Sequence, residues 1–131
     1  MGELLFKEES YAVQGAAYDV YKELRYGQKE KVYQNAFALA LQDRGLTVER
    51  EKRITMYYRN RKVGIYVPDF VVNGIMLIER KAKPFLLKED NRQFWQYLKN
   101  TAYRLGYLIN FGSPGGIEII RRVYDTARKQ R

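Results

Sequence analysis

Apolar side chains recur every three or four residues along three segments of the chain. Residues 10–27 repeat an apolar face before a glycine, and this spacing predicts a helix with Ser10 as its N-cap. Residues 28–45 repeat a similar face that begins at Glu30 and ends at a glycine suited to a C-cap. The same periodicity over residues 88–106 predicts a third helix. One carboxylate therefore stands at the head of the second helix's apolar stripe.

Shorter apolar runs, bounded by turn residues, predict strands in the rest of the chain. They cover residues 53–58, 63–72, 75–82, 107–111 and 117–124. Polar turns join the first three runs, which predicts an antiparallel meander. The second and third runs are apolar on both faces, as expected of central strands covered by helices. The order of elements predicts an α/β fold in which helices flank a mixed central sheet.

The length and the apolar pattern narrow the class of protein. The 131 residues fit one domain over residues 1–131, with a basic C-terminal tail at about residues 125–131. No apolar run approaches the ~20 residues of a membrane span, and the first residues lack the layout of a signal peptide. We therefore expect a soluble, cytoplasmic protein with no membrane partner.

Two missing residue types and an excess of positive charge constrain the chemistry. With no Cys and no His, the chain cannot use thiol or Ser–His catalysis, and any bound metal needs oxygen ligands. The formal net charge of +9 and the pI of about 9.7 favour a polyanionic partner such as nucleic acid. Charge alone does not establish nucleic-acid binding, because many basic proteins bind none.

Charged side chains interrupt the apolar run over residues 67–81. Glu79 and Lys81 are two apart in a predicted strand and project to one face, whereas Arg80 projects to the other. Burying either charge without a partner costs on the order of several kcal/mol. A Glu–Lys ion pair, or a strand end that reaches solvent, would account for these two charges. The third charge, Asp69 in the partner strand, raises a further possibility, because it could form a carboxylate pair with Glu79.

The register of the hairpin decides whether Asp69 meets Glu79. A two-residue turn at residues 73–74 leaves the two carboxylates on opposite faces of the sheet. A shift of one residue, from a three-residue loop or from a bulge near Pro68, places Asp69 directly across from Glu79. Because a proline cannot donate to the strand ladder, we predict such an irregularity. The paired carboxylates, with Lys81 alongside, would then have the composition of a Mg²⁺ site that activates water against a phosphodiester.

Two helical features could complete such a site. Glu30 points the way the apolar stripe points, although a favourable charge near a helix N-terminus explains it equally well. Gln93 and Tyr97 are four apart on the third helix and share one face, from which they could donate hydrogen bonds to a phosphate. An ordinary helix surface is the alternative interpretation of this pair.

Three motifs resemble those of the GxxExxY proteins, a branch of the PD-(D/E)XK nuclease superfamily related to RecB-like nucleases. The naming motif stands at residues 27–33 as GQKEKVY. The superfamily signature stands as Pro68-Asp69 followed by residues 79–81, and the Q-x-x-x-Y motif stands at residues 93–97. A later stretch, LINFGSP, is similar to the family's late strand and turn. The resemblance covers about residues 10–124, and three motifs in order are a specific signal.

The resemblance implies a restriction-endonuclease-like αβββαβ core with Asp69 and Glu79 as metal ligands. Lys81 would orient or activate the attacking water, and Glu30 would be a supplementary ligand or base. The backbone carbonyl of Arg80 is a further metal ligand in sites of this kind.

The remaining site residues and partners follow from the same resemblance. Tyr33, Gln93 and Tyr97 would position the substrate. The implied activity is that of a Mg²⁺-dependent deoxyribonuclease, with Mn²⁺ able to substitute, with DNA as partner and with a homodimer allowed. Because the chain has no cysteines, no iron–sulfur cluster is expected.

Two other functions remain open. One is a non-catalytic nucleic-acid-binding module that retains the nuclease fold, because a fold alone does not fix a function. The other is a scaffold protein that uses its twelve Tyr at an interface. We rank the scaffold last, because packing on the strands explains those tyrosines at least as well.

Overall fold

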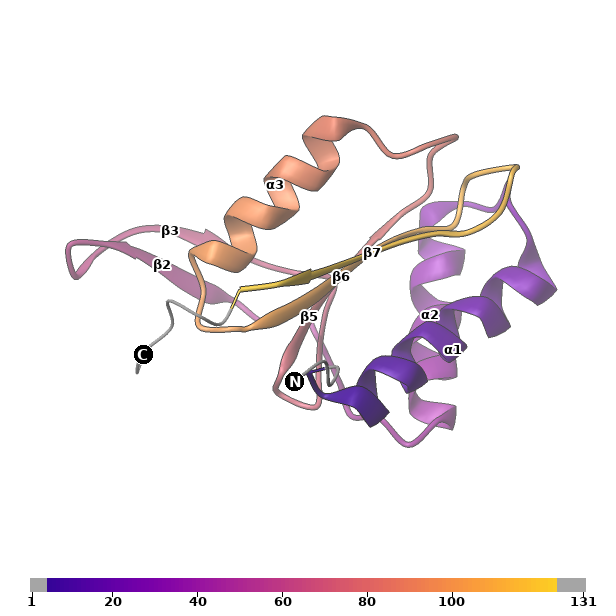
Figure 1. Ribbon diagram of the computed structural model, residues 1–131, viewed down its shortest axis with the longest axis horizontal. Helices are drawn as coiled ribbons and strands as arrows, with labels where there is room; N and C mark the ends of the chain where they lie inside the picture. Colours follow the sequence, from indigo (N-terminus) through magenta and orange to yellow (C-terminus); the bar gives the residue numbers. More distant parts are fainter. Residues whose placement is uncertain (1–4, 125–131) are drawn as a thin grey trace.

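The computed structural model describes residues 5–124, and the predicted basic tail at residues 125–131 lies outside the described residues. A twisted sheet carries helices on both faces, and a hairpin extends from one end of the molecule (Figure 1). The elements are, in chain order, α1 (Lys7–Leu24), α2 (Glu30–Asp43), β1 (Val48–Arg50), β2 (Ile54–Tyr58), β3 (Arg61–Tyr66), β4 (Phe70–Val72), β5 (Met76–Lys81), α3 (Lys88–Lys99), β6 (Leu105–Asn110) and β7 (Glu118–Val123). The predicted α/β class is confirmed.

The main sheet has five strands in the order β1-β4-β5-β6-β7. Only the central pair, β5 and β6, is parallel, and α3 makes the crossover that a parallel pair requires. The neighbouring pairs β1–β4, β4–β5 and β6–β7 are antiparallel. The series α2, β1, β4, β5, α3, β6 reproduces the expected αβββαβ order, and β7 adds an edge strand.

Two apolar clusters fill the space between the sheet and the helices. The first lies under α1 and α2 and includes Met76 and Ile78 of β5, while the second lies under α3 and includes Leu77. All three side chains are fully buried, as expected of a central strand covered on both faces. Continued along β5, this alternation directs Glu79 toward α3 and Arg80 toward α2.

The hairpin of β2 and β3 is a separate two-stranded sheet inserted between β1 and β4. The prediction that residues 53–58 belong to the same meander as residues 75–82 is therefore wrong. The predicted strand at residues 63–72 is divided, because the chain leaves strand conformation over residues 67–69, which include Pro68. This is the break that the proline predicted.

The third antiparallel strand of the main sheet is β1, which the sequence analysis missed. Its first residue, Val48, is half-buried, and the next two, Glu49 and Arg50, are exposed. A three-residue edge strand with one apolar position has no alternating pattern by which it could be recognised.

The turn between β4 and β5 sets the register on which the site depends. Residues 73–75 form a three-residue turn in which Asn73 and Gly74 take left-handed φ values of 53° and 68°. The observed pairs are Phe70 with Ile78 and Val72 with Met76. One step beyond this ladder, Asp69 lies opposite Glu79, so the predicted one-residue shift is confirmed.

The helix ends differ from those predicted. Ser10 is not an N-cap but a buried residue inside α1, where its hydroxyl donates to the Leu5 carbonyl at 3.3 Å. Helix α3 ends at Lys99 instead of residue 106, and Gly106 lies in β6. A Cβ on Gly106 would stand 2.6 Å from the Phe94 ring, so this glycine permits close packing of α3 and does not cap it. No helix within residues 5–124 is both long and apolar enough to cross a bilayer.

We predict that Gly112→Ala destabilises the protein. A Cβ at this position would lie 2.3 Å from the backbone nitrogen of Lys83 and 2.5 Å from the carbonyl carbon of Ala82, so backbone has to move. The expected loss in free energy of unfolding is about 1–3 kcal/mol, measured by urea denaturation. The matched control is Gly115→Ala, whose Cβ would meet nothing closer than 3.9 Å. Equal stability of the two variants would contradict the close approach at Gly112.

Candidate functional site

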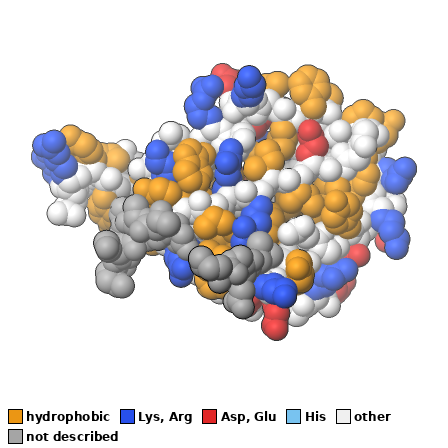
Figure 2. Space-filling model, viewed as in Figure 1, with side chains coloured by type: hydrophobic (Ala, Val, Ile, Leu, Met, Phe, Trp, Pro, Cys, Tyr) orange, Lys and Arg blue, Asp and Glu red, His pale blue; other side chains and the backbone are white. Residues whose placement is uncertain are grey.

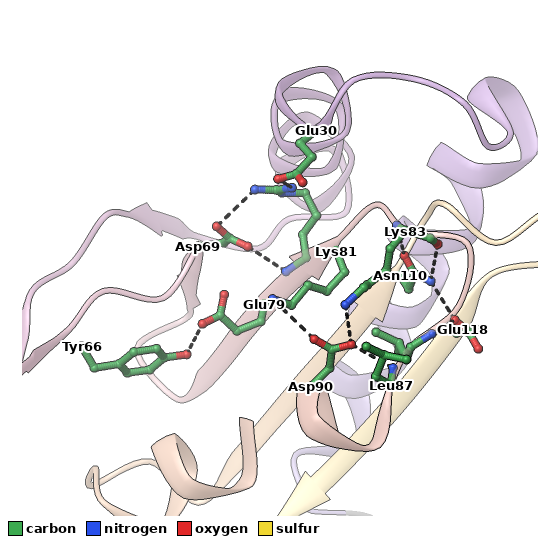
Figure 3. A network of polar contacts seen from close by, with 12 residues as sticks. Glu30, Tyr66, Asp69, Glu79, Lys81, Lys83, Leu87, Asp90, Asn110 and Glu118 are labelled. Carbon is green, nitrogen blue, oxygen red and sulfur yellow. Dashed lines mark hydrogen bonds and ion pairs between the residues drawn. The ribbon is translucent and has the colours of Figure 1, made fainter. Parts of the chain in front are cut away.

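The carboxylates of Asp69 and Glu79 lie next to one another where β4 and β5 emerge from the core (Figure 3). Glu79 follows Leu77 on the face of β5 that α3 covers, and Asp69 enters from the break before β4. The hydroxyl of Tyr66, at the end of β3, donates to Glu79 Oε2 at 2.5 Å. The structure thus brings together the two carboxylates that the sequence analysis paired.

The protonation state of Glu79 reflects this crowding. Burial raises the pKa of Glu79, and the adjacent charge of Asp69 raises it further, while the Tyr66 hydroxyl and Lys81 oppose the shift; the resulting pKa is about 7. Burial and the charge of Glu79 also raise the pKa of Tyr66 well above its ordinary value, so Tyr66 stays a hydrogen-bond donor. Two carboxylates this close favour a shared cation or a shared proton.

Arg80 links Asp69 to Glu30 from the opposite face of β5. Its backbone N–H donates to Asp69 Oδ2 at 2.7 Å, and its guanidinium lies 3.5 Å from Asp69 Oδ1 and 3.0 Å from Glu30 Oε1. The Arg80 side chain is 10% exposed, whereas that of Glu30 is 69% exposed. Arg80 Nε has no hydrogen-bond partner among the described residues.

This arrangement places Glu30, expected as a supplementary metal ligand or base, in an ion pair with Arg80 and not beside the carboxylate pair. The guanidinium of Arg80 binds the Glu30 carboxylate and separates it from Asp69 and Glu79. Within residues 5–124 no group of three or more acidic side chains could hold a metal ion together. The sequence analysis assigned a role only to the backbone carbonyl of Arg80, although a basic side chain on a buried face needs a carboxylate partner.

Lys81 shares the α3 side of the sheet with Glu79 and is held near Asp90 at the start of α3. Lys81 Nζ lies 4.0 Å from Asp90 Oδ1, while Lys83 Nζ binds Asp90 Oδ2 at 2.7 Å. Burial alone would raise the pKa of Asp90, but hydrogen bonds from Lys83 and from the Leu87 backbone outweigh it and hold that pKa below its ordinary value. Asp90 therefore stays charged and anchors both lysines.

Asn110, at the end of β6, fixes the loop that carries Lys83. Its side chain is fully buried; Oδ1 accepts from the Lys83 backbone N–H at 3.0 Å, and Nδ2 donates to the Lys83 carbonyl at 2.9 Å and to Glu118 at 2.7 Å. The sequence analysis missed Asp90, Asn110 and Glu118. A buried Asn at the end of an apolar strand was the available signal, because a buried amide needs several partners.

A small cavity of about 20 Å³ lies where Glu79 and Lys81 face α3. Glu79, Lys81, Asp90, Gln93, Phe94, Tyr97 and Leu108 line it. This volume holds about one water molecule or a bare ion, so any larger ligand has to lie across its mouth.

Of the three residues expected to position substrate, the structure brings two to this cavity. Gln93 and Tyr97 line it, and the Tyr97 ring stacks on Tyr66 with centroids 3.9 Å apart. Tyr33 is fully buried, so the expectation that it contacts substrate is wrong. Its hydroxyl donates to the Arg25 carbonyl and accepts from the Gln28 N–H, which fixes the connection between α1 and α2.

The donors present fit a hard divalent cation. Asp69 and Glu79 offer four carboxylate oxygens on one side of the sheet, and burial together with the adjacent charge of Asp69 raises the pKa of Glu79. Oxygen ligands of this kind suit Mg²⁺ or Mn²⁺. Arg80 is the one feature that competes, because its guanidinium already lies beside Asp69.

A family model described as the PD-(D/E)XK nuclease superfamily matches residues 7–123, nearly the whole chain. No curated protein and no solved structure matches significantly.

We predict that Glu79→Gln flattens the pH dependence of stability. The pKa of about 7 in the folded chain lies above the ordinary value of 4.5, so the folded state holds a proton that the unfolded state releases. The stabilisation from Glu79 is therefore complete below about pH 4.5 and lost as the pH rises through about 7.

The measurement is urea denaturation in a chelator at about pH 5 and about pH 8, where the wild type should lose about 1–3 kcal/mol more than Glu79→Gln. The control is Glu49→Gln, which removes a glutamate whose side chain is 52% exposed on β1. If wild type and Glu79→Gln show parallel pH curves, the carboxylate pair is not crowded in solution.

Proposed function

The chain belongs to the PD-(D/E)XK nuclease superfamily, and from this membership and the paired carboxylates we propose that it is a metal-dependent DNA nuclease. The observation that carries the proposal is the register that sets Asp69 opposite Glu79, with Lys81 on the same face. The GxxExxY branch is part of the proposal, because Gly27, Glu30 and Tyr33 stand at the spacing of its motif.

Asp69 and Glu79 would hold the metal, with the Arg80 backbone carbonyl as a further ligand. A bound Mg²⁺ would supply the Lewis acid that polarises the phosphodiester and lowers the pKa of the attacking water. Tyr66 donates to one oxygen of Glu79 and thereby fixes the rotamer of that carboxylate.

Lys81 is the cation best placed to act on the substrate. It shares the cavity wall with Glu79 and is 35% exposed, so its ammonium reaches solvent at the cavity mouth. There Lys81 would orient the attacking water and stabilise the charge that develops on the phosphate. Asp90 keeps Lys81 from pairing with Glu79 by supplying a carboxylate on the far side.

The side chains of Glu30 and Arg80 would position the site and would not bind the metal themselves. The Glu30 carboxylate draws the Arg80 guanidinium toward α2, which leaves it 3.5 Å from Asp69 instead of in closer contact. Gln93 and Tyr97, on the face of α3 that lines the cavity, would donate hydrogen bonds to the phosphate that lies across it.

DNA is the proposed substrate. The net charge of +9 favours a phosphate backbone, and its Lys and Arg would gain affinity from counterion release. The cavity's volume of about 20 Å³ is too small to enclose a metabolite, and a phosphate of a nucleic-acid strand would lie across its mouth.

A second candidate is a nucleic-acid-binding module without turnover. One observation favours it: both oxygens of Asp69 are already engaged by Arg80, through its backbone N–H and its guanidinium. In that case the Arg80 cation would stand where a nuclease of this kind needs a metal.

We predict that Asp69→Asn and Lys81→Ala each lower DNA cleavage by at least about 100-fold, because each removes a group that acts on the reacting atoms. The assay follows end-labelled linear, nicked and single-stranded DNA with Mg²⁺ or Mn²⁺, and a chelator blank defines the background.

The matched control for cleavage is Asp19→Asn. Asp19 also pairs with an arginine, Arg44 at 2.9 Å, but on an exposed surface of α1. The control should cleave as the wild type does. If Asp69→Asn cleaves DNA as fast as the wild type, the hydrolytic site does not lie on this face of the sheet.

We also predict that the metal stabilises the wild type but not Asp69→Asn. At ten times its dissociation constant, Mg²⁺ adds about 1.4 kcal/mol to the free energy of unfolding. Thermal denaturation with increasing Mg²⁺ measures the effect, with Ca²⁺ and K⁺ as comparison salts. A wild type that binds DNA but is neither stabilised by metal nor active in cleavage would favour the second candidate.

A further inference from the structure

A cleft separates the β2–β3 hairpin from the connection between α3 and β6. It encloses about 600 Å³. Residues 52–55, Tyr57, Asn60 and residues 100–103 line it. Its volume lies in the range of sites that bind organic ligands and is far larger than the cavity at Glu79.

All the charged side chains of the hairpin are basic. Residues 52–68 contain no Asp or Glu and five basic residues, Lys52, Arg53, Arg59, Arg61 and Lys62. In the part of the chain that the structure describes, Lys52 alone among these five forms an ion pair, with Glu49 at 3.6 Å. Figure 2 shows basic side chains at the tip of the hairpin beside apolar ones. Positive charge without a carboxylate partner favours a polyanion.

The cleft also exposes an aromatic ring and amides. Tyr57 is 59% exposed and lines the cleft wall. Asn60 in the hairpin turn and Asn100 at the end of α3 add amide groups on the two sides of the cleft. A ring for stacking, amides for base edges and cations for phosphates are the groups that bind unpaired nucleotides.

Helix α3 connects this cleft to the carboxylate cavity. Gln93 and Tyr97 share the face of α3 that lines the carboxylate cavity, and residues 100–103, which directly follow the end of α3, line the cleft. At about 1.5 Å per residue, Asn100 lies about 10 Å beyond Gln93 along α3. Tyr66 joins the two from the hairpin side, because its ring stacks on Tyr97 and its hydroxyl binds Glu79.

We propose that the cleft binds an unpaired strand of nucleic acid and leads it to the cavity at Glu79 and Lys81. The proposal rests on the proposed function only in taking that strand as the substrate. A duplex conceals its base faces, and a two-stranded ribbon in the major groove would contact DNA through its tip without using the ring of Tyr57 in the cleft.

The test is the binding of a fluorescently labelled oligothymidine of about 12 nucleotides, a length that covers a typical single-strand site. Fluorescence anisotropy is recorded in a chelator, so that no cleavage intervenes. Tyr57→Ala should weaken binding by roughly 5- to 100-fold through lost stacking. Tyr57→Phe should bind as the wild type does, because it keeps the ring.

The matched control is Tyr18→Ala, which removes a tyrosine that is 56% exposed on α1, away from the cleft. It should leave affinity unchanged, and circular dichroism checks that each variant is folded. Equal affinities of Tyr57→Ala and Tyr18→Ala would overturn the proposal. So would a loss at Tyr57 that is the same for a duplex of equal length.

A second measurement tests the charges. Replacing Arg59, Arg61 and Lys62 together with Gln should reduce the salt dependence of single-strand binding by about 2 in the log–log slope, at about 0.7 per phosphate contact. An unchanged slope would mean that the strand does not contact these three side chains, and it would contradict the proposal.

These results separate failure of the cleft from failure of the nuclease. If Asp69→Asn abolishes cleavage while Tyr57→Ala binds and cleaves as the wild type does, the nuclease stands and the cleft proposal falls. If Tyr57→Ala weakens binding but the wild type never cleaves, the cleft stands and the catalytic proposal falls.

Discussion

The opposition of Asp69 and Glu79 across one step of an antiparallel ladder is the constraint on which the rest of the site depends. Burial makes it costly to charge Glu79, and repulsion from the nearby charge of Asp69 adds to this cost. Both effects raise the pKa of Glu79. The surrounding groups reduce this cost without removing it. Tyr66 donates to Glu79, Arg80 approaches Asp69, and Lys81 stands on the same face as Glu79. Such a residual repulsion is what a cation-binding pair requires before the cation arrives.

The charges around this pair come from both layers of the fold, and their separation follows from the alternation of β5. Glu79 and Lys81 face α3, whereas Arg80 between them faces α2. Each basic side chain also contacts an acidic residue at a helix start, Arg80 with Glu30 of α2 and Lys81 with Asp90 of α3. The carboxylates at the two helix starts thus share the positive charge that stands beside the pair. This balance explains how Glu30, a motif residue, can influence the site without being a metal ligand.

How much the sequence could predict depended on the range of the interaction. The class of fold and the three helices follow from local periodicity, and the break before β4 follows from what Pro68 excludes in a strand. The register that sets Asp69 opposite Glu79 comes from the three-residue turn, which was one of the two irregularities expected. Partners across the sheet could not be predicted in this way. β1 has no apolar alternation, and the hairpin of β2 and β3 has the same pattern as any other pair of strands. Tyr33 matches a motif, although its hydroxyl binds the exposed connection between α1 and α2. Asp90 and Asn110 became evident only from their contacts with Lys83.

The inserted β2–β3 hairpin extends the molecule beyond its five-stranded sheet. Near its tip the ladder shifts register between Met56 and Tyr57, which twists the ribbon where the basic side chains stand. At its base, Tyr66 is buried and contacts both Glu79 and Tyr97. The hydroxyl of Tyr66 fixes one oxygen of Glu79 while its ring packs against α3. Because this tyrosine ends β3 and also orients Glu79, the base of the hairpin is part of the structure that supports the carboxylate pair.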